Sequence, residues 1–274
     1  MKFIALVTGC LTLGFSGTAI ASNSAITLPI RFLGTFPIVM AEIEGEDVPL
    51  TFDLGDSSAL VLQQQVIDRV KTIPSDKAHR GTDVKGNVIE SESFILPRLN
   101  LGGAVFNDVL GRPDKHDPTY RADDLGQQGY LGTSLLKSYL VILDYPHRKM
   151  TLIPAGDDQA AKCTGTVVPF LPEWNGEAVT KARTDYGERT AVWDTGAPIS
   201  LLRQPQAQDI GASELTQHST TKHLVLGGTD FGHLKLYLAN YAEPAGTDMF
   251  IGYNFFATHI VCVDFPGGRL LIQR

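Results

Sequence analysis

Short runs of apolar residues, each broken after a few positions by glycine, proline or charged residues, recur along most of the chain. Residues 36–44 and 48–52 are rich in β-branched and aromatic side chains and flank the polar break Glu44-Gly45-Glu46-Asp47. Runs of this length around a glycine-containing break are typical of strands joined by a tight turn. We therefore predict a β-hairpin that leads into Asp53, within a chain that is mostly β-strand.

The same pattern predicts further strands and one prominent interruption. A strand is expected at 93–101, where two glycines follow, and a hairpin is expected around the Gly-Asn pair at 86–87. Residues 63–70 fit a short helix. Residues 111–129 contain prolines, glycines and charges without an apolar period, which indicates a long surface loop. The polar segment at 154–164 is the expected boundary between two halves.

Two of the apolar runs carry an aspartate into a glycine-containing turn. The first includes Asp53-Leu54-Gly55-Asp56, and the second includes Asp194-Thr195-Gly196-Ala197. A carboxylate between strands that have a buried pattern must be hydrogen-bonded, paired with a charge or shifted in pKa. Asp53 and Asp194 are therefore candidate functional residues.

The two aspartate turns belong to a longer internal repeat. Tyr130-Leu131-Gly132 matches Phe250-Ile251-Gly252, and Asp144-Tyr145-Pro146 matches Asp264-Phe265-Pro266, both at an offset of 120 residues. The aspartate turns are offset by 141 residues. The difference of 21 is close to the length of the predicted loop at 111–129. One structural plan that is used twice, with an insertion in the first copy, accounts for both offsets.

With these motifs, the chain resembles the aspartic proteases, in which two lobes each contribute one apolar-Asp-x-Gly turn. The closing phrases Leu143-Asp144-Tyr145-Pro146 and Val263-Asp264-Phe265-Pro266 are most similar to bacterial retropepsin-like domains. The resemblance implies an all-β fold of two similar pepsin- or retropepsin-like β-barrel lobes, with the active-site cleft between them. It also implies a monomer, with an N-terminal lobe at 22–157 and a C-terminal lobe at 158–274.

The resemblance further implies that Asp53 and Asp194 form a catalytic pair that hydrolyses peptide bonds. Two adjacent carboxylates cannot both ionise, so they share a proton; one acts as general base on a water, and the other acts as acid toward the amide. The expected substrate is a peptide or protein, and the chemistry uses no metal and no other cofactor. Supporting roles are implied for the turn glycines Gly55 and Gly196, for the hydroxyl of Thr195 that bonds to the partner turn, and for Gly132 and Gly252 beneath the turns.

The first turn departs from the family pattern at two positions. Leu54 replaces a threonine, so hydroxyl bonds across the lobes can come only from Thr195. Asp56 replaces a serine or alanine and adds a third carboxylate as a possible modulator. If Asp56 points inward and ionises, it raises the pKa of the pair; if it points to solvent or caps the following turn, it has no such effect. Because of these departures, the alternative function is a non-catalytic peptide- or protein-binding module on the same fold.

Composition and the N-terminus set the remaining limits. The 274 residues are 43% hydrophobic and 19% charged, which suits one or two globular domains. Residues 1–21 have one lysine, an apolar core and small residues before the expected cleavage site, as in a secretory signal peptide. We therefore expect a periplasmic or secreted protein; a lipid anchor at Cys10 or an uncleaved membrane anchor is the alternative.

Removal of the signal peptide leaves two cysteines and an acidic chain. The net charge of the mature chain is about −8, which disfavours a nucleic-acid partner. Cys163 and Cys262 remain, either as one disulfide, which an exported chain allows, or as two buried free thiols.

Overall fold

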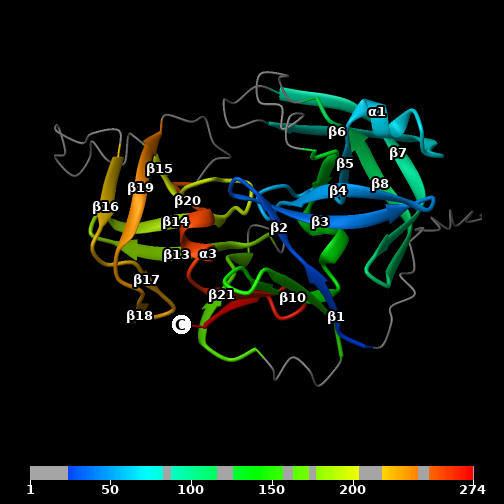
Figure 1. Ribbon diagram of the computed structural model, residues 1–274. Coiled ribbons are helices and arrows are strands. Elements are labelled where there is room, and N and C mark those ends of the chain that lie inside the picture. The colour runs from blue at the N-terminus through cyan, green and yellow to red at the C-terminus, as the bar shows by residue number, and fades with distance from the viewer. Residues whose placement is uncertain are drawn as a thin grey trace, which may run out of the picture.

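The computed structural model describes residues 24–82, 88–115, 126–156, 163–172, 177–203, 218–239 and 247–273. Strands dominate this part of the chain, and its helices are single turns: α1 (Gln64–Ile67), the 3₁₀ helix η3 (Thr133–Leu136) and α3 (Tyr253–Phe256). The strands form three sheets, two of which make the centres of separate lobes (Figure 1). The predicted all-β, two-lobed fold is confirmed.

The N-terminal lobe is built on an eight-stranded sheet in the order β2-β3-β4-β9-β5-β8-β7-β6. Its strands are β2 (Arg31–Leu33), β3 (Phe36–Ile43), β4 (Glu46–Phe52), β5 (Leu60–Leu62), β6 (Ile73–Thr82), β7 (Val88–Leu101), β8 (Ala104–Pro113) and β9 (Gly129–Leu131).

The C-terminal lobe repeats this plan in an eight-stranded sheet. Its strands are β13 (Val179–Thr184), β14 (Gly187–Trp193), β15 (Leu201–Arg203), β16 (His218–Thr221), β17 (Val225–Leu226), β18 (Thr229–Asp230), β19 (Leu234–Ala239) and β20 (Met249–Ile251). In both lobes a central short strand, β9 or β20, runs parallel to one neighbour and antiparallel to the other. The repeat in the sequence is therefore a repeat of topology.

A six-stranded sheet joins the halves below and between the two lobes (Figure 1). Its strands are β1 (Ile26–Pro29), β10 (Tyr139–Asp144), β11 (Lys149–Pro154), β12 (Thr166–Pro169), β21 (Ile260–Asp264) and β22 (Arg269–Gln273). At its centre β10 and β21 pair antiparallel, and Ile142 lies opposite Cys262. Because the repeat offset of 120 converts residue 142 into 262, this pair marks the pseudo-two-fold axis of the molecule.

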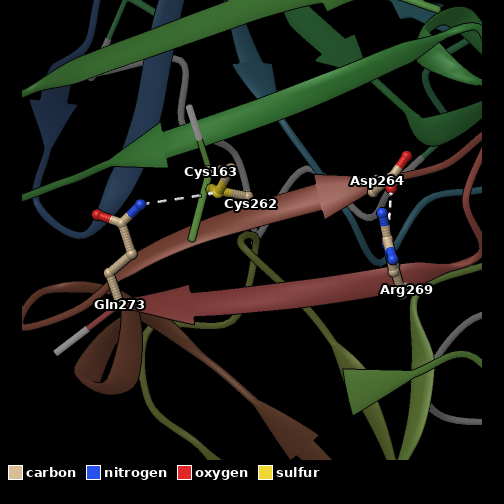
Figure 2. Close-up of a disulfide and its surroundings, with 5 residues drawn as sticks. All are labelled: Cys163, Cys262, Asp264, Arg269 and Gln273. Atoms are coloured by element: carbon tan, nitrogen blue, oxygen red, sulfur yellow. Dashed lines mark hydrogen bonds and ion pairs between the residues drawn. A yellow bond between two sulfur atoms is a disulfide. The ribbon is translucent and has the colours of Figure 1, made fainter. Parts of the chain in front are cut away.

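One apolar core runs through both halves, and a smaller cluster lies around the disulfide. Trp193 is fully buried and packs edge-on against Phe255 and Phe256. In the smaller cluster, Cys163 and Cys262 form a disulfide with a Cα–Cα distance of 6.4 Å (Figure 2). Of the two alternatives open from the sequence, the structure has the disulfide.

Two sequence-based predictions need correction. The hairpin turn at 44–47 is shorter than expected: Glu44 and Gly45 make it alone, both with positive φ, and the next residues already pair in β4. The predicted loop at 111–129 is wrong at its start, because residues 111–113 extend β8 and pair in parallel with β5. Strands β6 and β7 form the expected hairpin, whose Gly-Asn pair at 86–87 lies outside the described residues.

The signal peptide at 1–21 and the lobe boundary at 157/158 also lie outside the described residues and stay predictions. Within the described ranges, no helix is long and apolar enough to cross a membrane.

Candidate active site

Each of the two aspartates leaves its sheet at an equivalent point. Strand β4 ends at Phe52, and the N–H of Asp53 then donates to the carbonyl of Leu131 in β9 (2.8 Å). Strand β14 ends at Trp193, and the N–H of Asp194 donates to the carbonyl of Ile251 in β20 (3.0 Å). The parallel strand pairs β4–β9 and β14–β20 therefore hold the two aspartates at matching positions.

The two turns face each other across the lobes. Within each turn the glycine N–H donates to the aspartate two residues before it, from Gly55 to Asp53 and from Gly196 to Asp194, both at 2.8 Å. A Cβ atom on Gly55 would lie 2.8 Å from Cγ of Asp194, and one on Gly196 would lie 2.7 Å from Oδ2 of Asp53. Both positions require glycine, because a side chain would displace the opposite carboxyl.

The carboxyls of Asp53 and Asp194 hydrogen-bond to each other, and each retains some exposed surface. Burial by the surrounding protein raises the pKa of Asp53 well above its usual range, and the neighbouring charges of Asp194 and Asp56 add to this effect. Burial also raises the pKa of Asp194. The hydrogen bonds from the N–H of Gly196 and from Asp53 lower this pKa, but the effect of burial is larger. The two carboxyls therefore titrate as one coupled pair that shares a proton.

Thr195 links the two turns from one side. Its hydroxyl donates to the carbonyl of Phe52 (2.7 Å) and accepts from the N–H of Leu54 (2.9 Å), and the side chain is buried. Leu54, at the equivalent place in the first turn, is buried in the apolar core and has no hydroxyl to return these bonds. The hydrogen-bonded link between the turns is thus asymmetric.

Gly132 and Gly252 lie beneath the turns. A Cβ on Gly132 would meet the carbonyl oxygen of Asp56 at 2.5 Å, and one on Gly252 would meet that of Ala197 at 2.8 Å. The residues that follow each glycine bind the same turns, since the N–H of Thr133 donates to Asp56 and that of Tyr253 donates to Ala197 (both 2.9 Å). Both glycines allow backbone to pack directly against an aspartate turn.

Asp56 has a partner that the sequence did not reveal. One carboxylate oxygen accepts from the N–H (2.7 Å) and the hydroxyl of Ser58, which caps the following turn, and the other pairs with Arg112 at 3.0 Å. Both side chains of the pair are largely buried, so Asp56 does not point to solvent. Its charge still raises the pKa of Asp53 and of Asp194, so the two alternatives for Asp56 are both partly realised.

Arg112 and Tyr145 are the site residues that sequence reasoning missed. Arg112 lies in the part of β8 that was expected to be loop, and its Nε also donates to the hydroxyl of Ser58 (3.1 Å). Tyr145 lies beside Thr195, in a closing phrase that was used only to establish the repeat. An arginine next to Pro113 carries no local signal for a partner 56 residues earlier.

The two sheets, the joining sheet and the facing aspartate turns together define a two-lobed, pepsin-like fold of the aspartic proteinase type. Among solved structures, the chain is similar to the aspartic proteinase from Irpex lacteus, with 14% sequence identity and a TM-score of 0.63 over 91% of this chain and 97% of that one. No protein-family model and no curated protein matches the sequence. The likeness shows the fold, and it gives no support to the closer resemblance to bacterial retropepsin-like domains.

Proposed function

We propose that the protein is an aspartic endopeptidase that hydrolyses peptide bonds with Asp53 and Asp194. The observation that carries this proposal is the close approach of the two carboxyls between the facing glycine turns, in surroundings that raise the pKa of both. A carboxylate and a carboxylic acid side by side supply a base and an acid at the same time. The substrate is a peptide or protein segment bound between the lobes.

The two carboxyls divide the acid and base steps between them. Asp194 takes a proton from a water molecule, whose oxygen bonds to the peptide carbonyl carbon, while Asp53 gives its proton to the carbonyl oxygen. Asp194 then passes its proton to the amide nitrogen as the C–N bond breaks, and a hydroxyl of the diol returns a proton to Asp53.

The disulfide supports the further proposal that the protein is exported to the periplasm or the medium, with residues 1–21 as signal peptide. Disulfides such as Cys163–Cys262 persist in oxidising compartments and are rare in the cytosol.

The test is hydrolysis of denatured protein and mixed peptides between pH 3 and 7 by the wild type and by Asp53→Asn and Asp194→Asn. We expect each variant to lose about 10²- to 10⁴-fold in activity, because each removes one proton-transfer group, while its circular dichroism spectrum stays unchanged. Asp47→Asn is the matched control, since Asp47 is exposed in the strand that leads to Asp53. Undiminished hydrolysis in both site variants would refute the proposal.

A binding module without catalysis is the second candidate, and the first turn is what favours it. Leu54 leaves the link between the turns one-sided, and Asp56 adds a negative charge beside the pair. If the wild type hydrolyses nothing across this pH range but binds pepstatin or an extended peptide in calorimetry, the binding module is the correct function.

A further inference from the structure

Tyr145 lies beneath the second aspartate turn, where the halves of the molecule meet. It directly follows β10, and its side chain is buried. Its ring packs edge-on against Phe32 (centroids 4.9 Å apart) and lies 5.3 Å from Phe256 and 6.2 Å from Tyr253, both in α3. Because the N–H of Tyr253 holds the carbonyl of Ala197, this packing connects Tyr145 to the turn that carries Asp194.

Burial raises the pKa of Tyr145 well above its usual range, the negative charges of Asp53 and Asp194 add to this effect, and the neighbouring hydroxyl of Thr195 opposes it. The Tyr145 hydroxyl is enclosed by protein and forms no well-aligned hydrogen bond with any described residue. Burying a hydroxyl without a partner is unfavourable, whereas a phenylalanine ring at this position would carry no such penalty. The hydroxyl of Tyr145 therefore lowers stability unless it forms a hydrogen bond with a neighbouring acceptor.

The hydroxyl oxygen of Thr195 can accept one more hydrogen bond. Its hydroxyl hydrogen goes to the carbonyl of Phe52, and one lone pair of Oγ1 accepts from the N–H of Leu54. A hydroxyl oxygen has two lone pairs, so one acceptor position remains. The hydroxyl of Tyr145 can fill it as a donor after a small displacement.

The pseudo-two-fold axis makes the contrast with the other lobe clear. The repeat offsets relate Thr195 to Leu54 and Tyr145 to Phe265. One side of the axis thus has two neighbouring hydroxyls, and the equivalent positions on the other side have two apolar side chains, both buried in the main core. The first turn has no hydroxyl at Leu54. The first half of the chain instead has the hydroxyl of Tyr145, which directly follows β10.

We propose that Tyr145 is a positioning residue, whose hydroxyl donates to Thr195 Oγ1 and so gives the first half a hydroxyl in the link between the turns, in place of the one missing at Leu54. Its effect on hydrolysis rests on the proposed function, but its effect on the geometry of the aspartate pair does not. With this bond, Thr195 is held from both halves of the chain, and the spacing of the carboxyls is fixed.

The experiment compares Tyr145→Phe with Tyr139→Phe. Tyr139 is an ideal control because it lies in β10, is buried, and also has a hydroxyl without a described partner, but burial alone raises its pKa. The carboxyls of Asp53 and Asp194 are titrated by ¹³C NMR, which needs no enzymatic activity, and the pH profile of kcat/KM is recorded in parallel. We expect the Asp53 carboxyl to titrate at lower pH in Y145F, because the carboxyls separate and repel less, and to stay unchanged in Y139F.

A second background tests the replacement of the missing hydroxyl. Leu54→Thr restores the threonine of the family pattern, so Y145F should shift the Asp53 titration less in the L54T protein than in the wild type. L54T/Y145F also provides the measurement if Y145F alone does not fold. Equal titration curves for Y145F and Y139F would overturn the proposal, and so would equal shifts in the two backgrounds. If Y145F shifts the Asp53 titration as expected but the wild type hydrolyses no peptide, only the proposed function is contradicted.

Discussion

Asp56 and Arg112 show how a third carboxylate can stand next to a pair of acids. Their side chains are 16% and 8% exposed, and the guanidinium lies 3.0 Å from the carboxylate. A buried charge that loses its only partner is strongly destabilising, whereas loss of an exposed pair has little effect. The arginine is therefore what makes an aspartate tolerable at this position.

We predict that Arg112→Met lowers the free energy of unfolding by about 3 kcal/mol, because Asp56 is left without a counter-charge in a largely buried place. Urea unfolding at pH 7 measures this. Arg69→Met is the matched control, since Arg69 pairs with Glu46 at 3.1 Å on the surface and its loss should cost at most about 1 kcal/mol. The double variant D56S/R112M should recover much of the loss. The prediction fails if R112M is as stable as R69M.

At the residue scale, the sequence was sufficient to predict site residues that belong to a local motif. Asp53 and Asp194 stand out because an acid interrupts an apolar run, and Thr195 stands out because it fits a known pattern. Arg112 and Tyr145 could not be found in this way. Their importance depends on which side chain lies opposite in space, and Tyr145 reaches Thr195 only once both halves have packed.

At the scale of elements, the spacing of apolar residues and the turn residues were sufficient to predict a strand where the strand has polar or glycine-rich ends. The hairpin β3–β4 and the strand before Gly102 were anticipated for this reason. The end of β8 was not, because Gly111, Arg112 and Pro113 have the composition of a loop. These residues are strand because β5 offers a parallel partner, and such a partner comes from elsewhere in the chain.

The short central strands β9 and β20 are elements that local propensity alone does not define. Each has three residues and lies between a parallel and an antiparallel neighbour, and the parallel neighbour ends one residue before the aspartate. The repeat at offset 120 matched the two segments with each other, although it did not predict that they are strands. Comparing the two halves of the chain thus relates distant segments to each other, which the local spacing of apolar residues cannot do.

For the whole molecule, the aspartate pair makes stability depend on pH. The native pKa values of Asp53 and Asp194 are raised above the value of about 4 for an unfolded chain. The native state therefore binds more protons in this window, so the contribution of the pair to stability is complete below about pH 4 and is lost as pH rises through the native pKa values.

We predict that Asp53→Asn loses less stability than the wild type between pH 4 and pH 7, by about 1.4 kcal/mol for each unit by which the native pKa exceeds the unfolded one. The difference between the urea unfolding free energies of the two proteins, measured at several pH values, isolates this effect from other carboxylates. Asp47→Asn should follow the wild type, because Asp47 is exposed. Parallel curves for the wild type and D53N would contradict the prediction.

The disulfide acts on the whole C-terminal half. It connects Cys163, just before β12, to Cys262 on the molecular axis, across a sequence separation of 99 residues. We predict that Cys163→Ala/Cys262→Ala unfolds with about 2 to 4 kcal/mol less free energy, because a long loop is no longer closed in the unfolded chain. Urea unfolding of the oxidised wild type, the reduced wild type and the variant measures this. Equal midpoints for the oxidised and reduced wild type would refute it.

The pairing of Ile142 with Cys262 has a further consequence for how the two carboxyls come to meet. A slip of two residues between β10 and β21 would keep every side chain on its face of the sheet, but it would slide one half along the other by about 7 Å. That is more than twice the length of a hydrogen bond, so Asp53 and Asp194 would lose contact. The register of the β10–β21 pairing therefore sets the distance between the two aspartates, and the folding step that selects this register also assembles the site.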